Sequence, residues 1–139
     1  MTTVTDVMTR NVRTLTPSDT VASAAQAMDK LNVGVIPVCE GDKLLGMVTD
    51  RDLVVRAVAQ GLDGNTPLAK VMSAKVHTAR ETDDLDKVLA DMAAKQIRRL
   101  PVVDGANRLV GIVSIGDIAV KGQDEEDVGQ SLAEISSPA

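Results

Sequence analysis

Two segments of the chain place a hydroxyl residue and an aspartate three positions apart, directly after an apolar stretch. GMVTDRDL contains Thr49 and Asp52, and GIVSIGDI contains Ser114 and Asp117. This spacing is a variant of the capping box that starts a helix, and that role needs no ligand. The same groups suit a ribose phosphate, because the N–H groups at a helix start attract phosphate and a carboxylate accepts hydrogen bonds from a ribose diol. The two motifs alone leave both interpretations open.

An arginine pair favours the ligand interpretation for the second motif. Arg98 and Arg99 precede an apolar strand pattern in KQIRRLPVV. Because successive strand residues face opposite sides, at least one of the two can point toward a ligand cleft. The forked donors of arginine suit phosphate, although two solvated surface charges account for the pair equally well. The first half of the chain has Gly34 and Val35 at the matching positions and carries Arg51 inside its motif instead.

The two motifs recur because the chain contains two copies of one unit. Val7-Met8-Thr9 returns as Val71-Met72-Ser73 at an offset of 64 residues. Asp52 returns as Asp117 at an offset of 65, so the second copy has gained a single residue. This degree of regularity indicates a duplication. The sequence predicts a first repeat, a second repeat and an acidic amphipathic tail, over residues 1–64, 65–122 and 123–139.

Each copy predicts the same order of elements. A brief extended piece, over 12–15 or 76–79, leads into a helix whose apolar residues recur at helical spacing. These apolar residues are Val21, Ala24, Ala25, Met28 and Leu31 in the first copy and Leu85, Val88, Leu89 and Met92 in the second. Two short strands follow around a turn, VIPVC with LLGMVT and LPVVD with RLVGIVS. A final helix begins near Thr49 or Ser114 and runs through DLVVRAVAQ or DIAVKG.

The size of the repeat constrains the fold. A unit of about 60 residues buries little core of its own, so two such units must share one. We therefore expect an α+β fold with two repeats of β-α-β-β-α type. They would pack sheet to sheet with pseudo-two-fold symmetry.

The composition argues against nucleic-acid and membrane partners. The chain has 139 residues, of which 44% are hydrophobic and 25% charged, as in an ordinary globular domain. Five of its 20 acidic residues and none of its 15 basic residues lie after residue 122, so the rest of the chain is neutral. Without a basic face or an aromatic residue, the chain is poorly suited to nucleic acid. No apolar run reaches the roughly 18 residues of a membrane span and no leader pattern opens the chain, so we expect a cytoplasmic protein.

Other reactive side chains receive structural interpretations. Cys39, the single cysteine, fits a small buried hydrophobe in a reducing compartment. His77 has Arg13 at its place in the first copy, so we expect an exposed strand residue and not a base or a metal ligand. The methionines at apolar positions are expected to fill the core. The chain shows no nucleophile–base pair, metal cluster or glycine-rich phosphate loop, so we expect neither a metal nor a catalytic residue.

The paired motifs resemble CBS domains, named after cystathionine β-synthase, arranged as a two-repeat Bateman module. The resemblance spans nearly all of residues 1–122 and rests on DVMT, VIPV, RRLPVVD and the two motifs above. The nearest likeness is to small stand-alone bacterial proteins, some of which accompany hypoxic or general stress responses. The family implies a non-enzymatic regulatory module that holds AMP, ADP, ATP or S-adenosylmethionine in clefts between its repeats. These compounds act as regulatory ligands, not as cofactors, and two modules pair into a disc-shaped homodimer.

The resemblance also implies a nucleotide role for residues of both repeats. Ribose and nearby phosphate contacts fall to Asp117, Ser114, Asp52 and Thr49. The phosphate contacts of the second repeat fall to Arg98 and Arg99. The adenine is framed by Thr78 and Thr14 and clamped by Val12, Ile36, Val76 and Leu100. Because the first repeat lacks the arginine pair, the second repeat ranks first as a nucleotide site.

Two functions of different classes stay open at this point. The first is a homodimeric sensor that binds an adenosine nucleotide and changes its shape or its affinity for a partner. The second is a ligand-free dimerisation or interaction module, in which the two motifs only cap helices and residues 123–139 make contacts. Val128, Leu132 and Ile135 form an apolar stripe there that needs a partner surface, on its own module, the other subunit or another protein. A frayed terminus is the alternative for this tail.

Overall fold

The structure, a computed structural model, describes residues 2–116. Asp117 and the predicted tail over 123–139 lie outside the described residues. The chain divides into two compact units. We call Arg13–Val76 the first-repeat unit, and Met1–Val12 together with His77–Ala139 the second-repeat unit.

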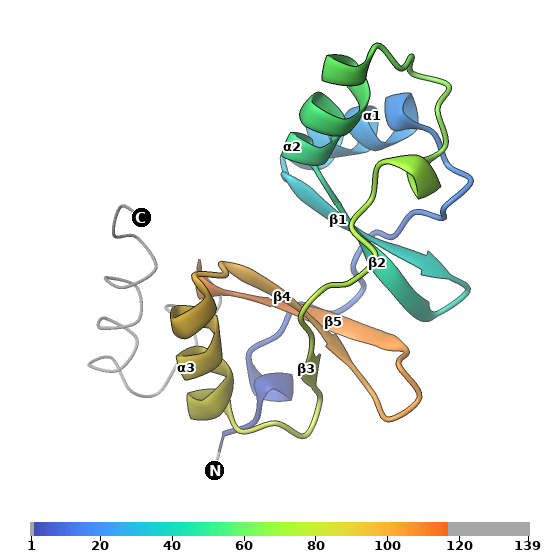
Figure 1. Ribbon diagram of the computed structural model, residues 1–139. Helices are drawn as coiled ribbons and strands as arrows, with labels where there is room; N and C mark the ends of the chain where they lie inside the picture. Colours follow the sequence, from blue (N-terminus) through green and yellow to red (C-terminus); the bar gives the residue numbers. More distant parts are fainter. Residues whose placement is uncertain (1, 117–139) are drawn as a thin grey trace. The chain divides into compact units, whose positions relative to one another are not determined.

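The first-repeat unit combines a β-hairpin with helical segments. Its elements are α1 (Val21–Leu31), β1 (Val35–Glu40), β2 (Lys43–Thr49), α2 (Asp50–Asp52), η2 (Leu53–Ala57), η3 (Val58–Gln60) and η4 (Leu68–Lys70) (Figure 1). β1 pairs antiparallel with β2 around a turn at Gly41, whose φ of +62° suits glycine. The predicted helix through DLVVRAVAQ forms as an α-helical turn, a π-helical segment and a 3-10 turn in succession. The predicted extended piece over 12–15 is reduced to one isolated parallel bridge, between Leu15 and Val38.

The second-repeat unit contains a three-stranded sheet. Its described elements are η1 (Val4–Asp6), β3 (Ala79–Arg80), α3 (Leu85–Lys95), β4 (Arg99–Val103) and β5 (Leu109–Ser114) (Figure 1). The strand order is β3-β4-β5, with β3 parallel and β5 antiparallel to β4. The register of this hairpin shifts between Val102 and Val103, and that of the other hairpin shifts between Val38 and Cys39. The two irregularities fall at matching positions of the repeats, in keeping with the duplication.

Each unit is completed by a segment that the sequence assigns to the other repeat. The N–H of Val4 donates to the carbonyl oxygen of Asp83 at 3.0 Å. Thr9 and Ile112 exchange two backbone hydrogen bonds, and Met47 and Ser73 exchange another two. The compact units therefore do not coincide with the boundaries 1–64 and 65–122, which follow sequence similarity. The physical reason is that the apolar segment leading each repeat covers the sheet of the other repeat.

The glycine that opens each motif permits this covering. A β-carbon on Gly46 would collide with the carbonyl oxygen of Ser73. A β-carbon on Gly111 would lie 2.7 Å from the carbonyl oxygen of Thr9, closer than real side chains approach. The recurring glycines thus serve the close approach of two backbones.

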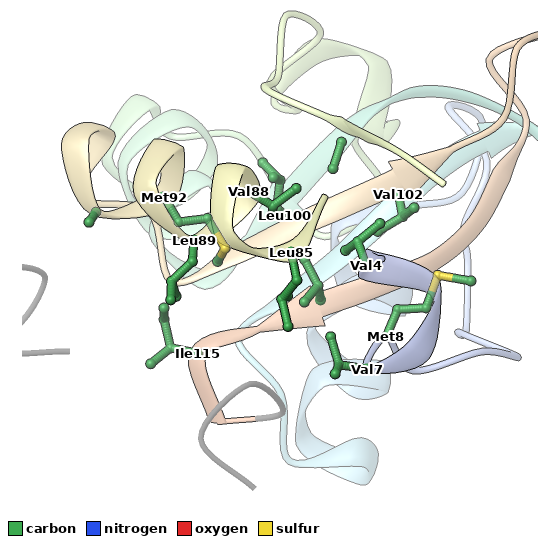
Figure 2. Packing of buried hydrophobic residues seen from close by; sticks show 13 residues of the cluster. Val4, Val7, Met8, Leu85, Val88, Leu89, Met92, Leu100, Val102 and Ile115 are labelled. Carbon is green, nitrogen blue, oxygen red and sulfur yellow. The ribbon is translucent and has the colours of Figure 1, made fainter. Parts of the chain in front are cut away.

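Each unit has its own apolar core. In the second-repeat unit, Leu85, Val88, Leu89 and Met92 of α3 are all buried, as predicted, and Figure 2 shows them in one cluster with Val4, Val7 and Met8. In the first-repeat unit, the predicted Val21, Ala24 and Met28 are buried. The prediction was wrong for Ala25, which is exposed on the flank of that face, and for Leu31, which is 44% exposed at the last residue of α1. Ala27 is buried instead.

These elements confirm the predicted α+β class. The sheet-to-sheet packing of the repeats and their pseudo-two-fold symmetry stay predictions. No helix within residues 2–116 is long and apolar enough to cross a membrane.

Candidate functional site

Both sequence motifs lie where the last strand of a hairpin passes into a helical turn. In the first-repeat unit, Thr49 ends β2 and pairs with Val35 of β1. In the second-repeat unit, Ser114 ends β5 and pairs with Arg99 of β4. The hydroxyl residues of the two motifs therefore occupy the same position of the fold.

A backbone hydrogen bond recurs beside each of these hydroxyl residues. The N–H of Asp50 donates to the carbonyl oxygen of Gly34 at 2.9 Å. The N–H of Ile115 donates to the carbonyl oxygen of Arg98 at 3.0 Å. This bond joins the residue after the motif hydroxyl to the residue before the hairpin. The two strand-to-helix turns thus share this backbone hydrogen bond and the pairing of their hydroxyl residues, and they differ in side chains.

Thr49 and Asp52 form the capping box that the sequence predicts. The N–H of Thr49 donates to Oδ2 of Asp52 at 3.0 Å, and the N–H of Asp52 donates to Oγ1 of Thr49 at 3.0 Å. Asp52 is 8% exposed and is the one buried charged residue among residues 2–116. Thr49 is half-buried. The cap occupies Oδ2 and leaves Oδ1 of Asp52 for a second partner.

Arg56 is that second partner, and it was not predicted from the sequence. Its Nε lies 3.7 Å from Oδ1 of Asp52. Its Nη1 donates to the carbonyl oxygens of Val71 at 3.4 Å and Met72 at 3.1 Å. The arginine thus joins the first motif to the segment that completes the first-repeat unit. The spacing of four residues between Asp52 and Arg56 on a helical turn was the signal that could have revealed this pair.

The turn at the second motif lies next to two arginines at the start of β4. Arg98 and Arg99 are both exposed, and Ser114 is half-buried. The hairpin register places Arg99 opposite Ser114, and the backbone hydrogen bond of Arg98 reaches the next residue, Ile115. The structure therefore brings the backbones of the arginine pair and the serine to one turn, and their contacts with a phosphate stay a prediction. Asp117, the predicted ribose ligand of this turn, lies outside the described residues.

A family model now accounts for this duplicated geometry. The model of the CBS domain matches residues 4–58 and again residues 68–122. The chain belongs to the CBS-domain family. The predicted resemblance is therefore confirmed, and both turns described above lie in CBS repeats. The two matched ranges fall inside the repeat boundaries drawn from the sequence.

Known CBS proteins align with the chain over nearly its whole length. The CBS domain-containing protein YhcV of Bacillus subtilis is 46% identical, with 98% of this chain and 96% of the relative covered. Hypoxic response protein 1 of Mycobacterium tuberculosis is 36% identical, with 99% of this chain and 96% of the relative covered. The solved CBS domain pair of protein MJ0100, in complex with 5′-methylthioadenosine and S-adenosyl-L-methionine, is 31% identical to this chain. Its TM-score is 0.74, with 86% of this chain and 98% of that chain covered.

The structure places the predicted base contacts of the CBS repeats in different environments. Ile36 and Leu100 are 1% and 2% exposed and belong to the apolar cores of their units. The other predicted base contacts are half-buried or exposed: Val12, Thr14, Val76 and Thr78. Val12 and Thr78 belong to the second-repeat unit, and Thr14 and Val76 to the first-repeat unit. The ligand contacts of all these residues, and the cleft between the repeats, stay predictions.

Cys39 and His77 have the surroundings that the sequence suggests, with one exception. Cys39 is 2% exposed, and burial, with a smaller contribution from the charge of Asp42, raises the pKa of its thiol. The neutral thiol is the small buried hydrophobe that was predicted. His77 is exposed, as predicted, but it precedes β3 and is not a strand residue. Within residues 2–116, no three histidine, cysteine or acidic side chains gather where they could hold a metal ion.

Proposed function

We propose that this protein is a regulatory module that binds an adenosine nucleotide at the strand-to-helix turn of its second CBS repeat. The ligand is AMP, ADP, ATP or a related adenosyl compound. Its binding changes the shape of the module or its affinity for a partner, and the module carries out no catalysis. We place the protein in the cytoplasm, in keeping with its single cysteine.

One observation carries this proposal. Arg99 lies opposite Ser114, and Arg98 is joined by a backbone hydrogen bond to the first residue after that serine. Arginines whose backbones lie next to a hydroxyl residue at the end of a strand suit a phosphate, because arginine donates paired hydrogen bonds to phosphate oxygens. Asp117 follows three residues after Ser114 and would accept hydrogen bonds from the ribose.

The comparisons support the adenosyl part of the proposal. The CBS domain pair of MJ0100 is solved with two adenosyl compounds and is 31% identical to this chain over the matched residues. The name of the Mycobacterium tuberculosis relative, Hypoxic response protein 1, supports a role in a stress response. We extend both properties to this chain as part of the proposal.

A homodimer is the second part of the proposal. Val54, Val55 and Val58 are 58%, 44% and 68% exposed on consecutive helical turns of the first-repeat unit. We call these three valines the apolar strip. Exposed aliphatic side chains of this kind favour contact with another protein surface. We propose that a second copy of this chain covers it in the homodimer that the family resemblance implies. The same strip favours the alternative function, a ligand-free dimerisation or interaction module whose two motifs only cap helices.

Nucleotide titration separates these two functions. The chain contains no tryptophan, tyrosine or phenylalanine, so an adenine that co-purifies dominates its near-ultraviolet spectrum. After any such ligand is removed, AMP is titrated by calorimetry into the wild type, Asp117→Ala and the double variant Arg98→Ala with Arg99→Ala. We expect binding to the wild type and at least a tenfold loss in both variants, at about 1.4 kcal/mol per tenfold.

Lys87→Ala is the matched control for this titration. Lys87 is an exposed basic residue on α3 of the same unit, so its removal changes the net charge without touching the turn. We expect it to keep the wild-type affinity for AMP. Full AMP affinity in the arginine variant would overturn the site assignment. Absence of binding by the wild type would favour the interaction module.

A further inference from the structure

The two strand-to-helix turns share a backbone hydrogen bond and differ in charge. The hydrogen bond from Asp50 to Gly34 in the first repeat is the counterpart of the bond from Ile115 to Arg98 in the second, at 2.9 and 3.0 Å. Where the second repeat has an arginine, the first has a glycine without a side chain. Where the second repeat has an isoleucine, the first has an aspartate.

The aspartate occupies the space beside the missing arginine. A β-carbon on Gly34 would lie 3.1 Å from Oδ2 of Asp50, so this carboxylate rests against the glycine. The N–H of Arg51 donates to Oδ1 of Asp50 at 2.8 Å and helps to hold the carboxylate there. The equivalent Ile115 is 8% exposed and packs into the core of its unit, whereas Asp50 is exposed. The first turn therefore has the negative charge of Asp50 beside Gly34, whereas the second turn has the positive charge of Arg98 at the position equivalent to Gly34.

The remaining charges of the first turn do not restore a phosphate site. Asp52 contributes a second carboxylate, and its cation, Arg56, already contacts that carboxylate and two backbone carbonyl oxygens. Arg51, the one basic residue within the motif, is exposed, and its backbone N–H contacts Asp50. A phosphate placed at this turn would lie near two carboxylates and would be repelled by them. A ribose would not be repelled, because its hydroxyl groups donate hydrogen bonds to a carboxylate.

We propose that the first-repeat turn selects an adenosyl compound that carries no phosphate and has an uncharged or cationic group in its place. Asp50 is the residue that determines this specificity. The inference rests on the proposed function, because it assumes that both turns bind adenosyl ligands. It divides the ligands of one chain into two classes, with phosphorylated compounds at the second repeat and unphosphorylated compounds at the first.

The test compares adenosine with AMP in the full chain whose second site is disabled by Arg98→Ala, Arg99→Ala and Asp117→Ala, because the two arginines hold phosphate and Asp117 holds the ribose in the proposed function. We expect adenosine to bind to this background and AMP to bind about tenfold more weakly, because of the repulsion between phosphate and carboxylate. Adding Asp50→Asn removes the charge and keeps the shape and the acceptor of the Arg51 hydrogen bond. We expect this change to raise the affinity for AMP about tenfold and to leave the affinity for adenosine unchanged.

Two further variants sharpen the comparison. Asp42→Asn removes an exposed aspartate from the β1–β2 turn of the same unit and should leave the preference for adenosine unchanged. The double change Gly34→Arg with Asp50→Ile copies the second repeat into the first, and the isoleucine removes the carboxylate that would crowd the new side chain. We expect this variant to prefer AMP.

The outcomes distinguish this inference from the proposed function. If the wild type binds AMP but the disabled background binds neither compound, or binds both equally, the inference is wrong and the proposed function stands. An unchanged preference in Asp50→Asn would also overturn the inference alone. If the wild type binds neither adenosine nor AMP, both are wrong.

Discussion

The guanidinium of Arg56 links the carboxylate of Asp52 to the backbone of a distant segment. Its Nε lies 3.7 Å from Oδ1 of Asp52, and its Nη1 donates to the carbonyl oxygens of Val71 and Met72. The side chain of Asp52 is 11% exposed and that of Arg56 is 50% exposed, so water screens the pair on one side only. The contact therefore stabilises the first motif and the segment that completes the unit together.

Replacement of Arg56 by methionine tests this link. Arg56→Met keeps an unbranched apolar side chain and removes the charge and the donors. We expect it to lower the free energy of unfolding by about 1 kcal/mol, measured by urea denaturation. The loss should be smaller in a background that already carries Asp52→Asn, because part of the interaction is then absent. Equal losses in both backgrounds, or an equal loss in the exposed neighbour Arg51→Met, would contradict the link.

Gly46 is expected to tolerate no side chain. In Gly46→Ala the new methyl group meets the carbonyl oxygen of Ser73 and the terminal methyl of Met72. Because the first of these atoms belongs to the backbone, the segment has to move, and we expect a loss of about 2 kcal/mol in the free energy of unfolding. Gly105→Ala is the control, since its nearest neighbour is the mobile end of Arg80 at 3.3 Å. Similar stabilities for the two variants would show that the backbones do not approach as closely as described.

The hydrogen bonds of Asp104 predict that the free energy of unfolding falls at acid pH. Its Oδ1 accepts from the N–H groups of Ala106 and Arg108 at 2.9 and 3.0 Å, and its Oδ2 accepts from Nε of Arg108 at 2.7 Å. These hydrogen bonds, above all that from the backbone N–H of Arg108, hold the pKa of Asp104 below its usual value. A carboxyl with a lowered folded-state pKa stabilises the fold above its unfolded pKa of about 3.9 and loses this effect as the pH falls through its folded pKa.

The acid dependence is measured by urea denaturation between about pH 7 and pH 3. We expect Asp104→Asn to show a flatter fall in stability than the wild type at the acid end. Asp86→Asn, on the exposed first turn of α3, should keep the wild-type fall. A wild-type fall in Asp104→Asn would show that other carboxyl groups account for the acid sensitivity.

The exposed valines predict the mode of association. Val54→Lys and Val58→Lys each place a charge in the apolar strip, where it would have to be buried in a dimer without a partner. We expect a dimeric wild type and monomeric variants, measured by light scattering. Leu45→Lys on β2, where the wild-type residue is 36% exposed, is the control and should stay dimeric. A monomeric wild type would remove the homodimer from the proposed function.

Local features of the fold and site could be predicted from the sequence. The cap between Thr49 and Asp52 was predicted because it joins residues three positions apart on one turn. The core face of α3 was predicted because Leu85, Val88 and Met92 repeat at the period of a helix.

Features that depend on distant parts of the chain were not predicted. Apolar residues such as Val4 and Met8 announce burial but do not specify which repeat will bury them. The contacts of Arg56 with Val71 and Met72 join residues that are 15 and 16 positions apart. The opposition of Asp50 to Gly34 depends on the register of a hairpin that brings the two residues together. The change from an α-helical to a π-helical turn after Asp52 could not be predicted from the spacing of apolar residues.

The exchange of leading segments between the repeats means that neither repeat can complete its core as a separate polypeptide. Cutting the chain between residues 64 and 65 removes Leu68 and Val71 from one core and Val4, Val7 and Met8 from the other. Two half-length polypeptides would each carry an incomplete hydrophobic cluster and would need the other half to fold. A single ancestral repeat would have completed its core by dimerising, with the leading segment of each copy packed on the sheet of the other copy. Fusion of two such genes would place both repeats, with their exchanged segments, in one continuous polypeptide. A circularly permuted chain that joins residues 77–116 to residues 2–12 would contain one unit with its core intact.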